Sequence, residues 1–417
     1  MQHFHDVTTI TLKKYYSEPH FIDWTTQPRS YKGYPHFYRR FNITDYEELA
    51  FIQNMGKITF EKTYYNQTIA LRTVPSAGGL YPCEVYIQIR GVENFLSGIY
   101  HYEPLSNTLV LLHELTHDGV EYYFNDQTLY QFTFLITCAY FRTAWKYSNR
   151  SIRYLLLDTG HQMGAIYAGL CLEKKEAEFE CELDDKALNS ILGLGNEEFL
   201  AGCIKVNTYK NKPLLPLREA LPFVQPCDYF IKNAFIEAFF QKSVEAKEYE
   251  FPLYEGLKML SQTQLQEAIN NRRSIRAFKK ESISYEIFLE ICQDIFELAR
   301  QNHIEIFMIN NNIEGIKKGV YKNVTLQKEG DFSQKAGFLA LNQTLAQTAC
   351  ATLFFTAPKT VAYTHTTKLC GFLAHMIYLK SSYFNIGCSG IGAYFDEEVQ
   401  QFLETPNNIF YLLVLGK

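Results

Sequence analysis

Residues 71–82 read Leu-Arg-Thr-Val-Pro-Ser-Ala-Gly-Gly-Leu-Tyr-Pro. Pro75 fixes its own φ angle and disfavours the helical conformation at the residue before it. The two adjacent glycines permit backbone conformations that other residues avoid, and they let a ligand approach the main chain closely. Arg72 contributes a planar cationic donor and Ser76 a hydroxyl. The stretch therefore predicts either a cradle for a polar, planar ligand or an ordinary Pro/Gly turn.

The overall composition excludes several classes of protein. The 417 residues are 47% hydrophobic and 20% charged, which is typical of a globular chain with a substantial core and predicts two or three domains. The net charge of −5 argues against nucleic-acid binding, which needs a basic face. The sequence shows no secretory signal and no run of about 18 apolar residues. We therefore expect a cytoplasmic protein that does not associate with a membrane.

The cysteines and histidines show no pattern that is typical of a metal site. The ten cysteines are scattered, without a Cys-x-x-Cys pair or a cluster with ligand spacing. We expect most of them to be reduced core residues. The His-Glu-x-x-His motif, the Walker-type phosphate loop and the Gly-x-Gly-x-x-Gly fingerprint are also missing from the sequence. The sequence therefore predicts neither a metal site nor an ATP-dependent enzyme.

The first half of the chain has helix and strand patterns on either side of the opening stretch. Thr44-Asp-Tyr-Glu47 is a capping box, and it predicts a helix that Gly56 ends. The apolar patterns that follow predict strands and one long helix. We expect strands at 85–89, 98–102, 108–112 and 132–139, the second and third forming a hairpin, and a helix at 152–172.

The second half repeats the first. Glu84-Val-Tyr-Ile matches Glu305-Ile-Phe-Met, and Gly98-Ile-Tyr matches Gly319-Val-Tyr at the same separation along the chain. A repeat of this length indicates a duplicated domain. His161 has His375 as its counterpart, and we expect both to be hydrogen-bonded core residues. The patterns predict helices at 229–247, 285–300 and 369–384, strands at 352–356 and 409–415, and a Gly-rich turn at 387–396.

Four motifs in the first half follow one another in a fixed order. They are Pro75-Ser-Ala-Gly-Gly-Leu-Tyr-Pro82, Gly98-Ile-Tyr-His-Tyr102, Trp145-Lys-Tyr147 and Arg153-Tyr-Leu-Leu-Leu-Asp-Thr-Gly-His161, preceded by an arm with His5, Asp23-Trp24, Gln27-Pro28 and residues 32–35. In this order the motifs resemble the SagB/ThcOx-type flavin dehydrogenases of the nitroreductase superfamily. The resemblance covers residues 5–161.

The resemblance and the repeat together imply an α+β fold. We expect two tandem nitroreductase-like domains, each a mixed, mostly antiparallel sheet flanked by helices, that form an intrachain pseudo-dimer. The expected parts are an N-terminal arm at 1–42, domain 1 at 43–206, a connector at 207–260 and domain 2 at 261–417. The protein is then a monomeric pseudo-dimer or a homodimer.

The second half opens with a basic run, Asn271-Arg-Arg-Ser-Ile-Arg276. Three guanidiniums and a hydroxyl this close together suit the binding of a phosphate. The alternative is a solvated basic run ahead of a helix. In the resembled superfamily such a run binds the phosphate of FMN, and the Gly-rich turn lies along the flavin ring. Each half lacks what the other contains, so the resemblance implies one intact FMN site. Its residues are Arg72, Pro75, Ser76, Ala77, Gly78 and Gly79 from the first half, and Arg272, Arg273, Ser274, Arg276, Ser389, Gly390, Ile391 and Gly392 from the second.

The resemblance also implies the catalytic residues. In the resembled dehydrogenases a Lys-Tyr pair is needed to oxidise a peptide thiazoline or oxazoline to the aromatic azole, and Lys146-Tyr147 corresponds to that pair. FMN takes a hydride while a base removes a proton. We therefore predict Lys146 as the base and Tyr147 as a donor or relay. The alternative is a surface lysine beside a packing tyrosine.

These residues predict an FMN-dependent dehydrogenase in natural-product biosynthesis. Its substrate would be linked to a peptide or a carrier, and a cyclodehydratase or synthetase would be its partner. Two alternatives stay open. One is an NAD(P)H-dependent nitro or quinone reductase, and the other is a degenerate, non-enzymatic nitroreductase-fold protein that binds partners.

Overall fold

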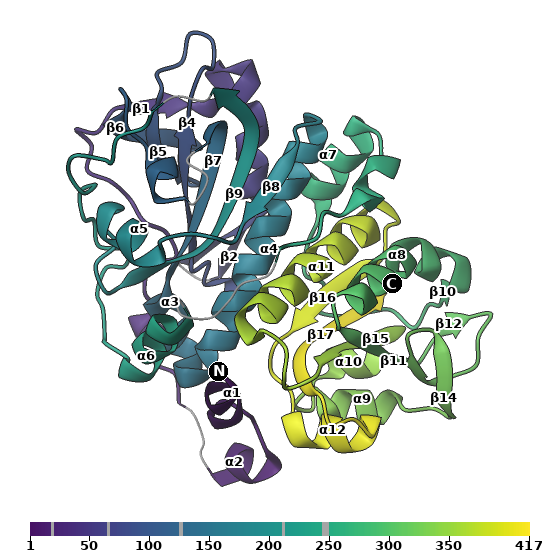
Figure 1. The fold of residues 1–417 in the computed structure, drawn as a ribbon. Coiled ribbons are helices and arrows are strands. Elements are labelled where there is room, and N and C mark those ends of the chain that lie inside the picture. The colour runs from purple at the N-terminus through teal and green to yellow at the C-terminus, as the bar shows by residue number, and fades with distance from the viewer. Residues whose placement is uncertain (18–20, 65–66, 125–127, 211–212, 244–249) are drawn as a thin grey trace. The chain divides into compact units, whose positions relative to one another are not determined.

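The computed structural model describes residues 1–17, 21–64, 67–124, 128–210, 213–243 and 250–417. They form two compact units, whose elements are labelled in Figure 1. The N-terminal unit is Asp23–Leu253, and the C-terminal unit is Met1–Ile22 together with Tyr254–Lys417. Each unit contains its own sheet.

The start of the chain belongs to the C-terminal unit because it hydrogen-bonds there. The Ile10 amide donates to the Asp396 carboxylate at 2.9 Å, and the Asp396 amide donates to the Ile10 carbonyl at 3.0 Å. The segment is not simply an extended arm, since it contains the short helices α1 (Gln2–Val7) and α2 (Leu12–Ser17). The boundaries expected at residues 42, 206 and 260 therefore differ from the boundaries of the two units.

The N-terminal unit is built on an antiparallel sheet. Among the described residues it has seven strands in the order β1-β6-β5-β4-β7-β9-β8. The strands are β1 (Arg40–Asn42), β4 (Cys83–Ile89), β5 (Gly98–Glu103), β6 (Thr108–Glu114), β7 (Leu129–Ala139), β8 (Ala177–Glu180) and β9 (Glu198–Lys210). A separate hairpin of β2 (Ile58–Tyr64) and β3 (Gln67–Arg72) leads into the Pro/Gly bend. The predicted strands and the predicted hairpin are confirmed.

The C-terminal unit has a second antiparallel sheet. Its described part has six strands in the order β14-β13-β11-β15-β17-β16. The strands are β11 (Glu305–Asn310), β13 (Gly319–Lys322), β14 (Thr325–Glu329), β15 (Ala351–Ala357), β16 (Gly387–Ile391) and β17 (Asn408–Gly416). The short strands β10 (Ile283–Ser284) and β12 (Ile313–Glu314) pair in parallel. Parallel and antiparallel pairing therefore occur together in this unit.

The two sheets share one strand order, which supports the duplication read from the sequence. The run β6-β5-β4-β7-β9-β8 corresponds position by position to β14-β13-β11-β15-β17-β16. The repeated Glu84 and Glu305 segments lie in the corresponding strands β4 and β11. The strand beside β4 is β7, and the strand beside β11 is β15. A long helix comes after each of these two strands in the chain, α4 (Ser151–Leu172) after β7 and α11 (Tyr363–Tyr383) after β15. In this correspondence the Gly-rich strand β16 takes the place of the charged strand β8.

Helices pack around each sheet (Figure 1). In the N-terminal unit they are α3 (Tyr140–Tyr147), α4, α5 (Asp185–Ile191) and α6 (Ala234–Ser243). In the C-terminal unit they are α7 (Gln262–Asn271), α8 (Tyr285–Gln301), α9 (Ser333–Leu339), α10 (Thr344–Thr348), α11 and α12 (Asp396–Leu403). Of the helices in the described part of the chain, none combines the length and the apolar character needed to cross a bilayer.

Two local predictions are wrong. Residues 44–55 do not form one capped α-helix but the 3₁₀ segments η2 (Ile43–Asp45) and η3 (Glu47–Met55). The Asn42 side chain caps the first segment by accepting the Thr44 amide, whereas Thr44 was the predicted cap. The first segment therefore begins at Ile43. Residues 387–391 form the edge strand β16 instead of a turn, because they pair with β17. Of the connector helix predicted at 229–247, residues Ala234–Ser243 form α6, residues 229–233 are not helical, and residues 244–247 lie outside the described residues.

A buried network of charges joins α3 to the sheet of the N-terminal unit. Arg142 of α3 forms an ion pair with Glu84 of β4 at 2.5 Å, and both side chains are almost fully buried. Glu84 also contacts His101 at 2.9 Å and accepts the Lys32 amide at 2.9 Å. Burial alone would raise the pKa of Glu84, but Arg142, His101 and Arg72 outweigh it and hold the pKa at about 2. Glu84 is therefore ionised at any pH above this value.

We predict that Glu84→Gln lowers the free energy of unfolding by about 3–5 kcal/mol, because it leaves the Arg142 charge buried without its partner. Since folding depresses the pKa of Glu84, its contribution is fully present above its ordinary value of 4.5 and is lost as the pH falls toward 2. Chemical denaturation at pH 7 and at pH 3 measures both effects.

The control for this prediction is Glu178→Gln. Glu178 is 62% exposed, and its partner Lys205 keeps a second carboxylate, Glu180, at 2.6 Å. We expect a change within about 0.5 kcal/mol for the control. An equally small change for Glu84→Gln would show that the buried pair does not stabilise the fold.

Candidate functional site

The Pro/Gly stretch is a closed bend between β3 and β4. The Ser76 hydroxyl accepts the Tyr81 amide at 2.9 Å, and the Ser76 carbonyl accepts the Gly79 amide at 3.1 Å. Gly78 and Gly79 have φ angles of +67° and +68°, in the left-handed region that glycine occupies readily. Tyr81 follows with φ of +44°. The predicted tight bend ahead of a strand is confirmed.

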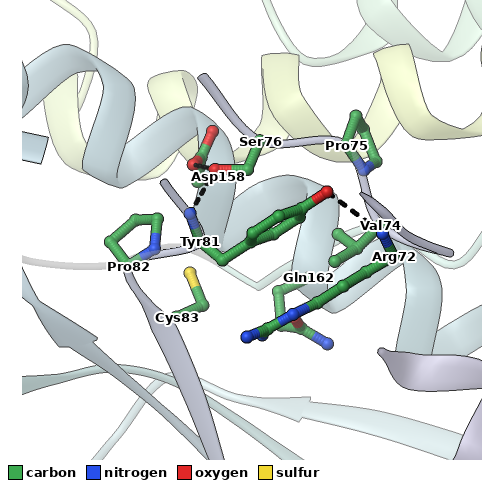
Figure 2. Close-up of a pocket in the computed structure, with 9 residues that line it drawn as sticks. All are labelled: Arg72, Val74, Pro75, Ser76, Tyr81, Pro82, Cys83, Asp158 and Gln162. Carbon is green, nitrogen blue, oxygen red and sulfur yellow. Dashed lines mark hydrogen bonds between the residues drawn. The ribbon is translucent and has the colours of Figure 1, made fainter. Parts of the chain in front are cut away.

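The bend is hydrogen-bonded to helix α4 through Asp158. The Ser76 hydroxyl donates to Asp158 Oδ2 at 2.5 Å, and the Ala77 amide donates to Oδ1 at 3.2 Å. Figure 2 shows the Asp158 carboxylate directed at Ser76 beside Tyr81. Asp158 was not among the predicted site residues, although it lies within the Arg153–His161 motif. A buried acid in an otherwise apolar helix was the available signal.

These residues border a small cavity of about 190 Å³ that is partly open to solvent. It is lined by Arg72, Val74, Pro75, Ser76, Tyr81, Pro82, Cys83, Asp158 and Gln162 (Figure 2). Pockets for complete small-molecule ligands usually measure about 300–1,000 Å³. Much of the 190 Å³ is open solvent, and the enclosed part has room for about one water molecule, so this cavity alone does not hold a complete ligand.

Arg72 forms one wall of the cavity, and protein groups already bind it. Its guanidinium donates to the Ser30 carbonyl at 2.7 Å and lies over the Tyr81 ring at 4.5 Å. The Arg72 amide donates to the Tyr81 hydroxyl at 3.0 Å. Burial lowers the pKa of Arg72, although nearby Glu84 opposes this effect. Arg72 thus supports Tyr81 and the bend in addition to facing the cavity.

The predicted catalytic pair lies against the bend. A Cβ atom added to Gly78 would stand 2.9 Å from the Tyr147 hydroxyl and 3.1 Å from Lys146 Nζ. Both residues end helix α3 and are half-buried. Lys146 Nζ lies 4.9 Å from the Trp24 ring centre, and the Tyr147 ring packs on Tyr154 at 4.3 Å. The structure therefore brings Lys146 and Tyr147 together with the predicted cofactor-binding glycines of the same unit.

In the C-terminal unit, Tyr378 of α11 joins the basic run to the Gly-rich strand. Its hydroxyl accepts the Gly390 amide at 2.7 Å and lies 2.9 Å from the Ser274 hydroxyl. The Ile275 amide donates to the Cys388 carbonyl at 3.0 Å. Arg272 is 3% exposed, with its guanidinium 5.4 Å from the Tyr378 ring centre. The structure therefore brings Arg272, Ser274 and Gly390 together around Tyr378.

The other predicted residues of this unit are placed less uniformly. Arg273 donates to the carbonyls of Asn270 and Arg272 at 2.9 and 2.7 Å, and Arg276 is exposed. The hydroxyl of Ser389 is buried without a hydrogen-bond partner in the described part of the chain. Ile391 is buried and Gly392 half-buried. The side chains of the basic run thus do not converge as a group.

The cysteines and the possible metal ligands carry no further site. Eight of the ten cysteines are buried, and Cys171 and Cys181 are half-buried. Among residues that the structure describes, no three His, Cys, Asp or Glu side chains are grouped so that they could hold a metal ion. The candidate residues therefore form two clusters, the bend with its lysine–tyrosine pair in the N-terminal unit and the Tyr378 cluster in the C-terminal unit.

The contact at Gly78 leads to a paired prediction. Gly78→Ala and Gly79→Ala should each cost about 1–2 kcal/mol of stability, because both force alanine into the left-handed region. Of the two added Cβ atoms, only the one at Gly78 meets Lys146 and Tyr147, since nothing lies within 4 Å of one at Gly79. We expect Gly78→Ala alone to change the rate at which an amine-specific reagent labels Lys146. Mass spectrometry of the labelled peptide measures this rate, and equal labelling in both variants would contradict the contact.

Parts of this chain are similar in sequence to known proteins. Residues 269–417 match the model of the Nitroreductase family. A curated protein of Methanocaldococcus jannaschii, named as a nitroreductase, is 28% identical over 122 residues, which are 28% of this chain and 61% of that protein. The match thus spans less than two thirds of the length of this relative.

Two solved structures are also similar to this chain or to part of it. The crystal structure of a protein named as a nitroreductase from Anabaena variabilis covers 100% of this chain and 99% of its own, with 22% identity and a TM-score of 0.81. A chain of the E. coli microcin synthetase McbBCD complex, with truncated pro-MccB17 bound, covers 51% of this chain and 82% of its own at 16% identity. Its TM-score of 0.33 is too low to support an argument. Residues 269–417 are thus similar to the Nitroreductase family, and the whole chain shares the fold of the Anabaena variabilis structure.

Proposed function

We propose that this protein is an FMN-dependent dehydrogenase. Its reaction would convert a thiazoline or oxazoline, carried on a peptide or a carrier, to the aromatic azole. The observation that carries the proposal is the contact of Lys146 and Tyr147 with Gly78, at 3.1 and 2.9 Å from a Cβ placed there. A base and a phenol beside a glycine-rich bend are what proton removal next to a flat cofactor requires.

The residues present fit FMN. A guanidinium that is almost fully buried, as in Arg272, suits a phosphate, because arginine binds phosphate oxygens through two parallel hydrogen bonds. The buried Ser389 hydroxyl, which lacks a partner among the described residues, is a donor that a ligand can use. In the N-terminal unit, the bend from Pro75 to Gly79 offers backbone close to its surface. We propose that the bend in the N-terminal unit and Arg272 and Ser389 in the C-terminal unit are FMN-binding residues, with Arg273 and Arg276 in supporting roles.

The chain's own side chains supply the proton chemistry. When bound, FMN accepts a hydride at its N5. Conversion of an azoline to an azole removes one proton and one hydride from neighbouring carbons, so the substrate loses two hydrogens in total. Lys146 takes the proton, and the faces of Trp24 and Tyr147 stabilise the ammonium ion that results. Tyr147 donates a hydrogen bond to the substrate or relays the proton.

The proposed reaction also indicates a partner. An azoline forms when a side chain cyclises onto the preceding carbonyl with loss of water, a reaction that precedes the proposed oxidation. We therefore propose that a cyclodehydratase or a synthetase supplies the substrate.

A second candidate is an NAD(P)H-dependent nitro or quinone reductase. The names of the Methanocaldococcus jannaschii relative and the Anabaena variabilis structure favour it. Stopped-flow absorbance separates the two candidates. Rapid reduction of the FMN-loaded protein by NADPH without any peptide supports the reductase, whereas reduction only by an azoline peptide supports the dehydrogenase. A protein that binds no flavin would be neither.

We predict that Arg272→Ala weakens FMN binding by about tenfold or more, the factor expected when a hydrogen bond to a charged group is lost. The control is Arg300→Ala, which removes an exposed arginine paired with Glu297 on α8. Fluorescence titration with FMN measures both affinities. If the two variants bind FMN equally well, Arg272 does not hold the phosphate.

We predict that Lys146→Ala slows azole formation by about 10²–10⁴-fold, the usual contribution of a general base, while FMN binding stays unchanged. A matched control is Lys175→Ala, since Lys175 also lies over two aromatic rings, those of Phe51 and Phe132. Mass spectrometry of an azoline peptide detects the loss of two hydrogens. Undiminished turnover in Lys146→Ala would overturn the assignment of the base.

A further inference from the structure

We propose that Asp158 is a positioning residue that holds the bend at residues 76–81 against Lys146 and Tyr147. Its consequence for turnover rests on the proposed function. The hydrogen bonds that hold the bend lie within the N-terminal unit, and they can be tested without any activity.

The direction of the hydrogen bonds carries the proposal. A serine hydroxyl has one proton to donate. Ser76 gives that proton to Asp158 at 2.5 Å, so a lone pair of the same oxygen is left to accept the Tyr81 amide at 2.9 Å. Asp158 also accepts the Ala77 amide at 3.2 Å. The Asp158 carboxylate thus orients the Ser76 hydroxyl that closes the loop from Ser76 to Tyr81, and it also binds the Ala77 amide.

The two ends of the bend are held by neighbouring helices. Asp158 of α4 binds the Ser76 end, and Arg142 of α3 donates to the Tyr81 carbonyl at 2.7 Å. Helix α3 also ends in Lys146 and Tyr147. Removing the Asp158 contact therefore frees Gly78, which lies between these supports, to move relative to the lysine–tyrosine pair.

The surroundings of Asp158 explain why its charge state matters. The titratable or charged groups that line the cavity with it are Arg72, Tyr81 and Cys83. The Cys83 thiol faces Cys138 at 3.9 Å, and this contact together with burial raises its pKa well above the usual value. The Arg72 guanidinium donates to the Ser30 carbonyl. No ion pair with Asp158 is recorded in the described part of the chain.

Burial raises the pKa of Asp158 to about 7, although the hydrogen bonds from Ser76 and Ala77 act in the opposite direction. Hydrogen bonds to a carboxylate are stronger than those to a neutral acid. The bend is therefore held most firmly above pH 7, and turnover should rise through that pH. The free energy of unfolding depends on pH in the opposite direction. The folded pKa exceeds the ordinary value of 3.8, so the contribution of this group is fully present below pH 3.8 and declines up to pH 7.

The test uses Asp158→Asn, Ser76→Ala, the double variant and Ser76→Thr. Hydrogen exchange of the protein without added flavin reports on the amides of Ala77 and Tyr81. We expect both single variants to speed their exchange by about tenfold, the factor for a lost hydrogen bond to a charged group, and the double variant to add little. Ser76→Thr keeps the hydroxyl and should restore slow exchange. Asp118→Asn, which alters another buried carboxylate of the same unit, serves as the control.

Turnover of the azoline peptide by the FMN-loaded protein is the second readout. We expect Asp158→Asn to lower kcat by about tenfold and to abolish the rise near pH 7, with FMN affinity changed less than kcat. Unchanged exchange in Asp158→Asn, or additive effects of the two single variants, would overturn the proposal. A protein that binds no FMN would refute the proposed function, while the exchange results would still decide whether Asp158 holds the bend.

Discussion

The buried ion pair between Glu84 and Arg142 is the interaction on which the N-terminal unit depends. It joins a central strand of the sheet to helix α3 where neither charge reaches water. A buried charge is tolerated only with a partner and further hydrogen bonds. Arg142 meets this requirement through the carbonyl of Tyr81, and Glu84 through His101 and the amide of Lys32. The pair therefore fixes one end of the glycine bend as well as the core.

The duplicated architecture separates the scaffold from the chemistry. Both units use the same strand order with a long helix after the corresponding strand, and in both the strands are mostly buried. The candidate site residues are the parts that do not repeat. The Pro/Gly bend occurs in the N-terminal unit alone, whereas the basic run and the Gly-rich strand β16 occur in the C-terminal unit alone. Apolar burial can thus preserve a fold while the polar groups of the candidate site diverge.

Glycine has a distinct physical role at each of the two clusters. At Gly78 the missing side chain leaves room for the ends of Lys146 and Tyr147, and the positive φ angle is available without strain. At Gly390 a Cβ would collide with the hydroxyl of Tyr411, so only glycine lets β16 pass beside that ring. Both clusters therefore combine bare backbone with a tyrosine hydroxyl, Tyr147 in one and Tyr378 in the other. This combination suits a flat, polar ligand better than a purely apolar one.

The sequence by itself determined several of the strands, most of the long helices α4 and α11, the repeat and the tight bend, because each follows from local periodicity or from Pro and Gly chemistry. It also indicated Lys146, Tyr147 and Arg272 through motif resemblance. Only the tertiary structure decided the role of Asp158, which lies 82 positions from Ser76, and the pairing that makes residues 387–391 a strand. It also showed Arg273 bound to backbone carbonyls and Arg276 exposed. These outcomes depend on contacts between residues that are distant in the sequence, and local sequence patterns do not specify such contacts.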